Sequence, residues 1–112
     1  MDRITTYKEI LRTELEERAV LINSDFPNIK FHLIHNEELT EFVLIRFGWH
    51  EYRYRHHIVF HFQIIEDKIW IHQNNTDVEI GTILAEKGIP KSNIVFGFVG
   101  ELERGVEGYA IA

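Results

Sequence analysis

The sequence contains no cysteine, and only two prolines and seven glycines interrupt its 112 residues. The absence of cysteine excludes disulfide bonds, thiolate catalysis and cysteine-based zinc sites together. No apolar run approaches the roughly 18 to 20 residues that a membrane span requires, and the first residues lack the apolar segment of a signal peptide. We therefore expect one domain, residues 1–112, located in the cytoplasm.

Basic charge is also scarce, because 12 lysines and arginines stand against 18 acidic residues and give a net charge of -6. The basic residues are mostly scattered, so the sequence shows no evident phosphate-binding surface. Direct, tight DNA binding by the isolated chain is therefore disfavoured. A hydrophobic content of 45% is enough for a core of its own.

The stretch 58–74 has the pattern of a β-hairpin. Read with period two, its core face consists of Ile58, Phe60, Phe62, Ile64, Ile69 and Ile71. A two-residue turn at Glu66 and Asp67 places His61 opposite His72, and Gln63 opposite Trp70. This turn type needs a positive φ at both central residues, which glycine or asparagine adopts more cheaply.

Two helices are predicted. Apolar residues recur at three and four positions along the N-terminal stretch, namely Ile4, Tyr7, Leu11, Leu15, Ala19 and Ile22. Asp2 or Thr6 would cap this helix, and Phe26-Pro27 cannot continue it. Thr76 and Glu79 have the spacing of a capping box that opens a second helix, which Gly88 ends.

Strands are predicted at residues 28–35, 39–49, 52–65, 68–74 and 94–98, with a turn at His50 and Glu51 between the second and third. Residues 109–112 are expected to pack back on the fold. The sequence thus predicts an α+β protein with an N-terminal helix, an antiparallel β-meander of about four strands, a second helix and short C-terminal strands.

The seven histidines suggest a metal site, and His61 with His72 is the strongest candidate pair of ligands. A catalytic zinc needs a third protein ligand, however, and no HExxH spacing occurs. Half-exposed strand histidines are the simpler interpretation. No nucleophile elbow or phosphate-binding glycine pattern is present either, so we expect no catalytic residues, metal or cofactor.

Aromatic residues are the stronger indication of function, because tryptophan and tyrosine are enriched among the anchors of protein interfaces. In the predicted register Trp49, Tyr52 and Tyr54 share one face of the meander, while Trp70 lies on the other. Three arginines are predicted on the Trp70 face: Arg46, Arg53 and Arg55. Core packing is the alternative role for each tryptophan. The candidate partner-binding residues are Trp49, Tyr52, Tyr54, His61, Trp70 and His72.

The chain resembles the XisI family, the fdxN-element excision controlling factors of cyanobacteria. The residues that carry the resemblance span most of the chain: Gly48-Trp49, His61, Lys68-Ile69-Trp70-Ile71, Gln73, Thr76, Gly88, Pro90-Lys91, Ile94-Val95, Gly97-Phe98 and Gly108-Tyr109-Ala110. The chain departs from the family pattern at two expected Asp-Gly turns, where it has His50-Glu51 and Glu66-Asp67. It departs again after Phe98, where the family has His-Pro-Pro.

The resemblance implies a small α+β protein without established catalytic residues. It would act beside a partner called XisH and a site-specific recombinase, in the excision of a DNA element during heterocyst differentiation. A non-enzymatic factor that binds such a partner is the favoured hypothesis, and a homo-oligomer is compatible with it. A DNA-binding regulator of excision and a histidine-based metalloenzyme remain the alternatives.

Overall fold

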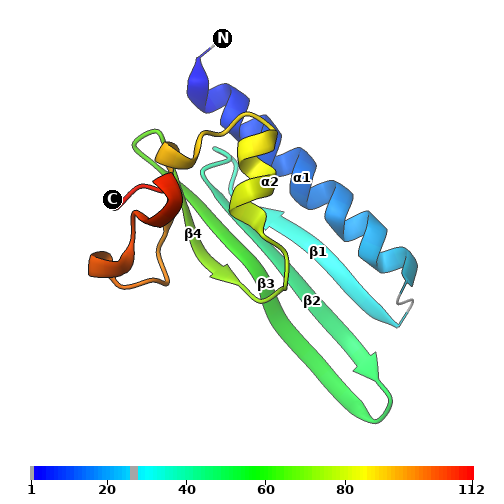
Figure 1. Cartoon of the computed structure of the whole chain (residues 1–112). Helices are drawn as coiled ribbons and strands as arrows, with labels where there is room; N and C mark the ends of the chain where they lie inside the picture. The colour runs from blue at the N-terminus through cyan, green and yellow to red at the C-terminus, as the bar shows by residue number, and fades with distance from the viewer. Residues whose placement is uncertain (1, 26–27) are drawn as a thin grey trace.

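The computed structural model describes residues 2–25 and 28–112, and of residues 21–25 only the backbone. Its order of elements is α1 (Arg3–Asp25), β1 (Ile29–His35), β2 (Glu41–His50), β3 (Arg53–Ile65), β4 (Lys68–Asn74), α2 (Ile80–Glu86) and β5 (Ile94–Phe96). The strands form one sheet in sequence order, antiparallel from β1 to β4, with β5 parallel to β4 (Figure 1). The predicted α+β class and meander are confirmed. Instead of further C-terminal strands, short 3-10 helices follow β5.

Helix α1 buries the predicted stripe, of which Tyr7, Leu11, Leu15 and Ala19 are shielded from solvent. Asp2 caps it as predicted, because its side-chain Oδ1 accepts a hydrogen bond of 2.8 Å from the N–H of Thr5. The predicted contributions of Ile22 and of Phe26-Pro27 lie outside the described side chains and residues. None of the helices in the described part of the chain is long and apolar enough to cross a membrane.

Both helices cover the same face of the sheet, as Figure 1 shows. The α2 residues Ile80 and Leu84 join the same core as the stripe of α1. From the sheet, the fully buried members of this core are Phe42, Leu44, Phe60, Phe62, Ile69, Ile71 and Ile94. The predicted core face of the hairpin is therefore confirmed at its centre, where the burial of large apolar side chains stabilises the fold most.

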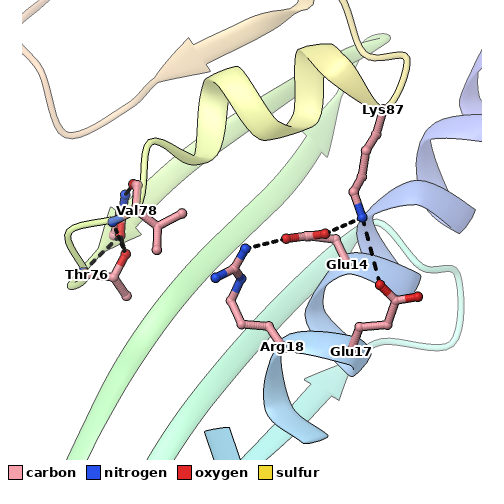
Figure 2. A network of polar contacts seen from close by, with 7 residues as sticks. Glu14, Glu17, Arg18, Thr76, Val78 and Lys87 are labelled. Atoms are coloured by element: carbon pink, nitrogen blue, oxygen red, sulfur yellow. Dashed lines mark hydrogen bonds and ion pairs between the residues drawn. The ribbon is translucent and has the colours of Figure 1, made fainter. Parts of the chain in front are cut away.

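The start of α2 differs from the predicted capping box. Its N-cap is Glu79, which makes no capping hydrogen bond with its side chain. Thr76 instead shapes the preceding turn, since its Oγ1 donates to Asn74 Oδ1 at 2.6 Å and accepts from the N–H of Val78 at 3.1 Å (Figure 2). The capping-box prediction is wrong because a local turn bond of threonine competes with the cap.

The end of α2 is as predicted. Gly88 has a φ of 117° and follows the last helical turn. Its N–H donates to the carbonyl of Ala85, and the N–H of Ile89 donates to the carbonyl of Leu84. This pair of bonds is the Schellman arrangement that stops helices at glycine.

An ion cluster joins the two helices (Figure 2). Glu14 of α1 is only 4% exposed, and its carboxylate accepts from Arg18 and from Lys87, which follows α2, at 2.6 Å each. Burial alone raises the pKa of Glu14, but the hydrogen bonds from Lys87 and Arg18 outweigh it, and the net pKa lies below its usual value. The cluster therefore holds Glu14 in its charged form.

A bulge in β3 changes which side chains reach the core. Leu44 pairs with Phe60 while Ile45 pairs with Ile58, so Val59 is an extra residue in β3. Val59 is buried, and Ile58 points to the opposite face and is exposed. The predicted placement of Ile58 in the core is therefore wrong, because strict alternation does not cross a bulge.

The two hairpin turns fall close to their predicted places. Glu66 and Asp67 form a two-residue turn in which both have a positive φ, of 47° and 67°. The other turn lies one residue later than predicted, since His50 pairs with Arg53 and leaves Glu51 and Tyr52 at the tip.

The C-terminal segment packs back on the fold as predicted. The N–H of Ala110 donates to the carbonyl of Ile94 in β5 at 2.9 Å. The ring of Tyr109 packs edge-on against Phe96, with 4.5 Å between ring centroids. Strand β5 itself ends at Phe96, two residues before the predicted end at Phe98.

Candidate functional site

The face of the sheet opposite α1 and α2, here called the open face, is covered by neither of these two helices (Figure 1). Its register follows from the β2–β3 pairs Val43 with His61, Phe47 with His56 and Trp49 with Tyr54. Apolar side chains that are half-buried or exposed run across β1, β2 and β3 on this face: Ile34, Val43, Ile45, Phe47, Trp49, Tyr54 and Ile58. Sequence reasoning did not assemble this surface, although the apolar character of both faces of β2 is a signal for it.

Trp49 and Tyr54 form an exposed aromatic pair near the hairpin tip. Their ring centroids are 5.4 Å apart in an edge-to-face arrangement. Trp49 is 59% exposed and Tyr54 is 53% exposed, so neither tryptophan nor tyrosine serves as core here. Tyr52 lies in the turn itself and is 99% exposed. Large aromatic side chains at this level of exposure are typical of binding surfaces.

The structure corrects the predicted faces. Trp49 and Tyr54 lie on the same face as Trp70, because the bulge at Val59 shifts the alternation between the two halves of β3. The same shift moves the arginines: Arg46, Arg53 and Arg55 share a face, as predicted, but it is the helix-covered face and not that of Trp70.

His61 and His72 meet on the open face, although not as directly opposed residues. A bulge at His72 pairs His61 with Gln73, while Phe62 pairs with Ile71. The imidazole centroids of His61 and His72 are nevertheless 4.9 Å apart. The predicted register is thus correct from Phe62 to the turn and wrong by one residue beyond it.

Each of the two imidazoles has its own polar neighbour. His61 Nε2 lies 2.8 Å from Glu41 Oε1, and His72 Nε2 lies 2.9 Å from Gln63 Oε1. Among the described residues, no group of three or more histidine, aspartate or glutamate side chains is arranged to hold a metal ion. The arrangement orients the rings at the surface of the sheet.

Protonation of His72 is disfavoured in the folded protein. Burial lowers the pKa of its imidazole, and the neighbouring His61 lowers it further against an opposing effect of Glu41. The folded pKa thus lies below the ordinary value of 6.5. Stability that depends on neutral His72 is complete above pH 6.5 and is lost as the pH falls from there through the folded pKa.

We expect an NMR titration to show the His72 imidazole protonating below pH 6.5 in the folded protein. In His61→Gln the charge that repels protonation is absent, so the His72 midpoint should rise. A His72 midpoint at or above 6.5 in the unmodified protein would contradict this assignment.

Trp70 is covered in part by the C-terminal segment. The guanidinium of Arg104 lies 5.1 Å from the centroid of the indole ring, a cation–π distance. Arg104 is itself held by the carbonyls of Val99 and Ile111, at 2.9 and 3.0 Å. The β4 end of the open face is therefore partly closed, and its β1–β3 part is exposed.

The family model described as XisI protein matches residues 1–111. The chain belongs to the XisI family. A XisI-like protein from Anabaena variabilis has a similar structure, with a TM-score of 0.83 and 27% identity over 99% of this chain and 100% of that one. The fdxN element excision controlling factor XisI from the same organism gives a TM-score of 0.81 and 29% identity over the same shares. No curated protein matches the chain.

Proposed function

We propose that this XisI family member is a non-enzymatic controlling factor of DNA-element excision that acts by binding a protein partner. The observation that carries the proposal is the exposed aromatic pair Trp49 and Tyr54 on an open, apolar sheet face. A sheet that packs against helices on one face and is also apolar on its other face leaves that second face without a covering surface. The similarity to a named excision controlling factor supports the biological context.

The partner that we propose is an XisH-like protein, working with a recombinase. Its contact surface would be centred on Trp49, Tyr54 and the neighbouring Phe47, with Tyr52 at the rim. His61, Trp70 and His72 border this surface on the β4 side, where Arg104 already covers the indole. Those three residues would orient and limit the contact, and the exposed aromatic pair would supply most of its affinity.

We expect Trp49→Ala to weaken capture of a co-expressed XisH-like protein by at least about tenfold, since aromatic anchors typically contribute 2 kcal/mol or more. Affinity is measured by calorimetry or biolayer interferometry on the purified pair. The matched control is Leu102→Ala, which removes a fully exposed apolar side chain of the C-terminal segment, outside strands β1 to β3, and should leave affinity unchanged.

Three results would contradict the proposal. Equal effects of Trp49→Ala and Leu102→Ala would show that the open face is not the contact surface. A well-folded protein that does not bind the co-expressed XisH-like protein would refute that protein as the partner. Light scattering that finds a stable dimer of this chain, dissociated by Trp49→Ala, would assign the open face to a second copy.

A further inference from the structure

The outer end of the β2–β3 hairpin has an unused edge. Strand β3 begins at Arg53, but β4 pairs only with its residues Phe60–Ile65. Asn75 occupies the edge of β3 beside Ile58 and Val59. Its N–H donates to the carbonyl of Val59 at 2.9 Å, and its side-chain amide donates to the carbonyl of Ile58 at 2.8 Å. From Arg53 to His57, no strand of the described chain lies on this side of β3. Edges of this kind accept an additional strand.

On the sheet face that α1 and α2 cover, this end of the hairpin carries a row of basic side chains, here called the basic ladder. It consists of Arg46, His50, Arg53, Arg55 and His57. Arg46 stands opposite His57, and His50 stands opposite Arg53. No carboxylate among the described side chains forms an ion pair with any of them. The positive charges of Arg46, Arg53 and Arg55 are therefore not balanced by an ion pair within the described part of the chain.

A hollow beside the ladder provides room for an acidic group. Its volume is about 480 Å³. Its lining residues are Ile29, Phe31, Arg46, His50, Arg55, Val59, Asn75 and Thr76. The Nε of Arg46 is shielded from solvent and has no hydrogen-bond partner among the described residues. A buried donor of this kind is normally satisfied, and carboxylate and phosphate oxygens are the acceptors that match a guanidinium.

The other side of the same edge is mostly apolar. Tyr54, His56 and Ile58 alternate with the ladder residues along β3 and point to the open face, where His56 lies beside Phe47. A strand added beside residues 53–57 would therefore meet basic groups on one side and mainly aromatic and apolar groups on the other. Alternating acidic and apolar residues in an extended segment satisfy both sides at once.

We propose that the free edge of β3 at Arg53–His57 binds an extended segment of a partner protein in which acidic residues, facing the basic ladder, alternate with apolar residues. The inference rests on the proposed partner binding and names the chemistry of the partner. A second copy of the chain does not fit, because pairing β3 with β3 sets basic residues against basic residues. Nucleic acid would match the ladder, but it would leave the strand edge and the apolar side unused.

The test uses a fluorescent peptide, acetyl-Glu-Val-Glu-Tyr-Glu-Val-Glu-Val-amide, and the full chain, with binding followed by anisotropy. We expect Arg53→Glu/Arg55→Glu to weaken binding at least tenfold. The matched control is Arg3→Glu/Lys8→Glu, which makes the same change of charge on α1 and should alter binding less than twofold. Equal thermal midpoints of the two variants show that folding is not the cause of the difference.

Two peptide variants test the mode of binding. Replacing each glutamate by lysine should abolish binding, and replacing the two central residues by proline should weaken it at least tenfold, because proline cannot donate to a strand edge. Hydrogen exchange at residues 53–57 should slow when the original peptide is bound. Tight binding of the proline peptide would overturn strand addition.

Other outcomes overturn the proposal in distinguishable ways. If the acidic peptide does not bind but capture of the XisH-like protein still depends on Trp49, the proposed binding at the β3 edge is wrong and the proposed function stands. If the peptide binds but the XisH-like protein is not captured, the proposed partner is wrong and binding at the edge stands. A 20-base-pair DNA duplex that binds more tightly than the peptide, loses affinity steeply with salt and depends on Arg53 and Arg55 would assign the ladder to nucleic acid.

Discussion

Replacing Gly48 by alanine is expected to lower the free energy of unfolding by more than about 3 kcal/mol. Gly48 has a φ of 142°, a conformation that residues with a Cβ adopt only with strain. A Cβ at this position would lie 2.3 Å from the carbonyl oxygen of Asn28 and 3.0 Å from the Cα of Ile29. Both are backbone atoms at the start of β1, so they cannot move without breaking the pairing of Ile29 with Gly48.

Two glycines separate strain from collision in this experiment. Gly108 also has a positive φ, of 93°, but nothing lies within 4 Å of its Cβ position, so Gly108→Ala measures strain alone. Gly100 has neither feature and should lose no stability as alanine. Urea unfolding of the three variants gives the comparison. A Gly48→Ala variant as stable as Gly108→Ala would refute the collision with β1.

Glu14→Gln is expected to cost about 3 kcal/mol of stability at neutral pH, because it removes the buried carboxylate of the ion cluster. Arg18 then has no carboxylate partner among the described side chains, and Lys87 keeps only the 3.9 Å contact with Glu17. The matched control is Glu9→Gln, on the same helix. Glu9 pairs with Arg12 at the same distance of 2.6 Å, but its side chain is 56% exposed. The control should change stability by less than about 0.5 kcal/mol.

The stability that Glu14 contributes is expected to depend on pH. The pKa of Glu14 lies below its ordinary value of 4.5 in the folded state, so its contribution is complete above pH 4.5. It is lost as the pH falls from 4.5 through the folded pKa. The stabilities of the unmodified protein and of Glu14→Gln should therefore converge on acidification in urea unfolding at a series of pH values. A gap that stays constant down to pH 3 would exclude the ionised carboxylate as its source.

Local patterns in the sequence were sufficient for much of the fold. The stripe Tyr7, Leu11, Leu15 and Ala19 predicted α1, because a helix repeats its buried face every three to four residues. Gly88 predicted the end of α2 for a reason of backbone geometry alone. Such features depend on few neighbours, so a single sequence contains them.

The candidate surface was harder to predict because two bulges control it. Ile58, Val59 and Phe60 are all apolar, so nothing in the pattern shows that Val59 is the extra residue. One unrecognised insertion exchanges the two faces for the rest of the strand. That error separated Trp49 from Trp70, and it placed the arginines on the wrong side. Trp49, Tyr52 and Tyr54 were named from the sequence as candidate partner-binding residues, with core packing as the alternative for Trp49, but their grouping needed the register.

The strict sequence order of the sheet also bears on how the chain folds. Each of the first three strands pairs with the strand that follows it, so the meander grows by closing loops of only a few residues, and the entropy cost of each closure is small. Strand β5 must instead return parallel to β4 after the α2 crossover. The pairing of β5 with β4 therefore has the largest loop-closure cost in the sheet, and we expect it to order after the hairpins.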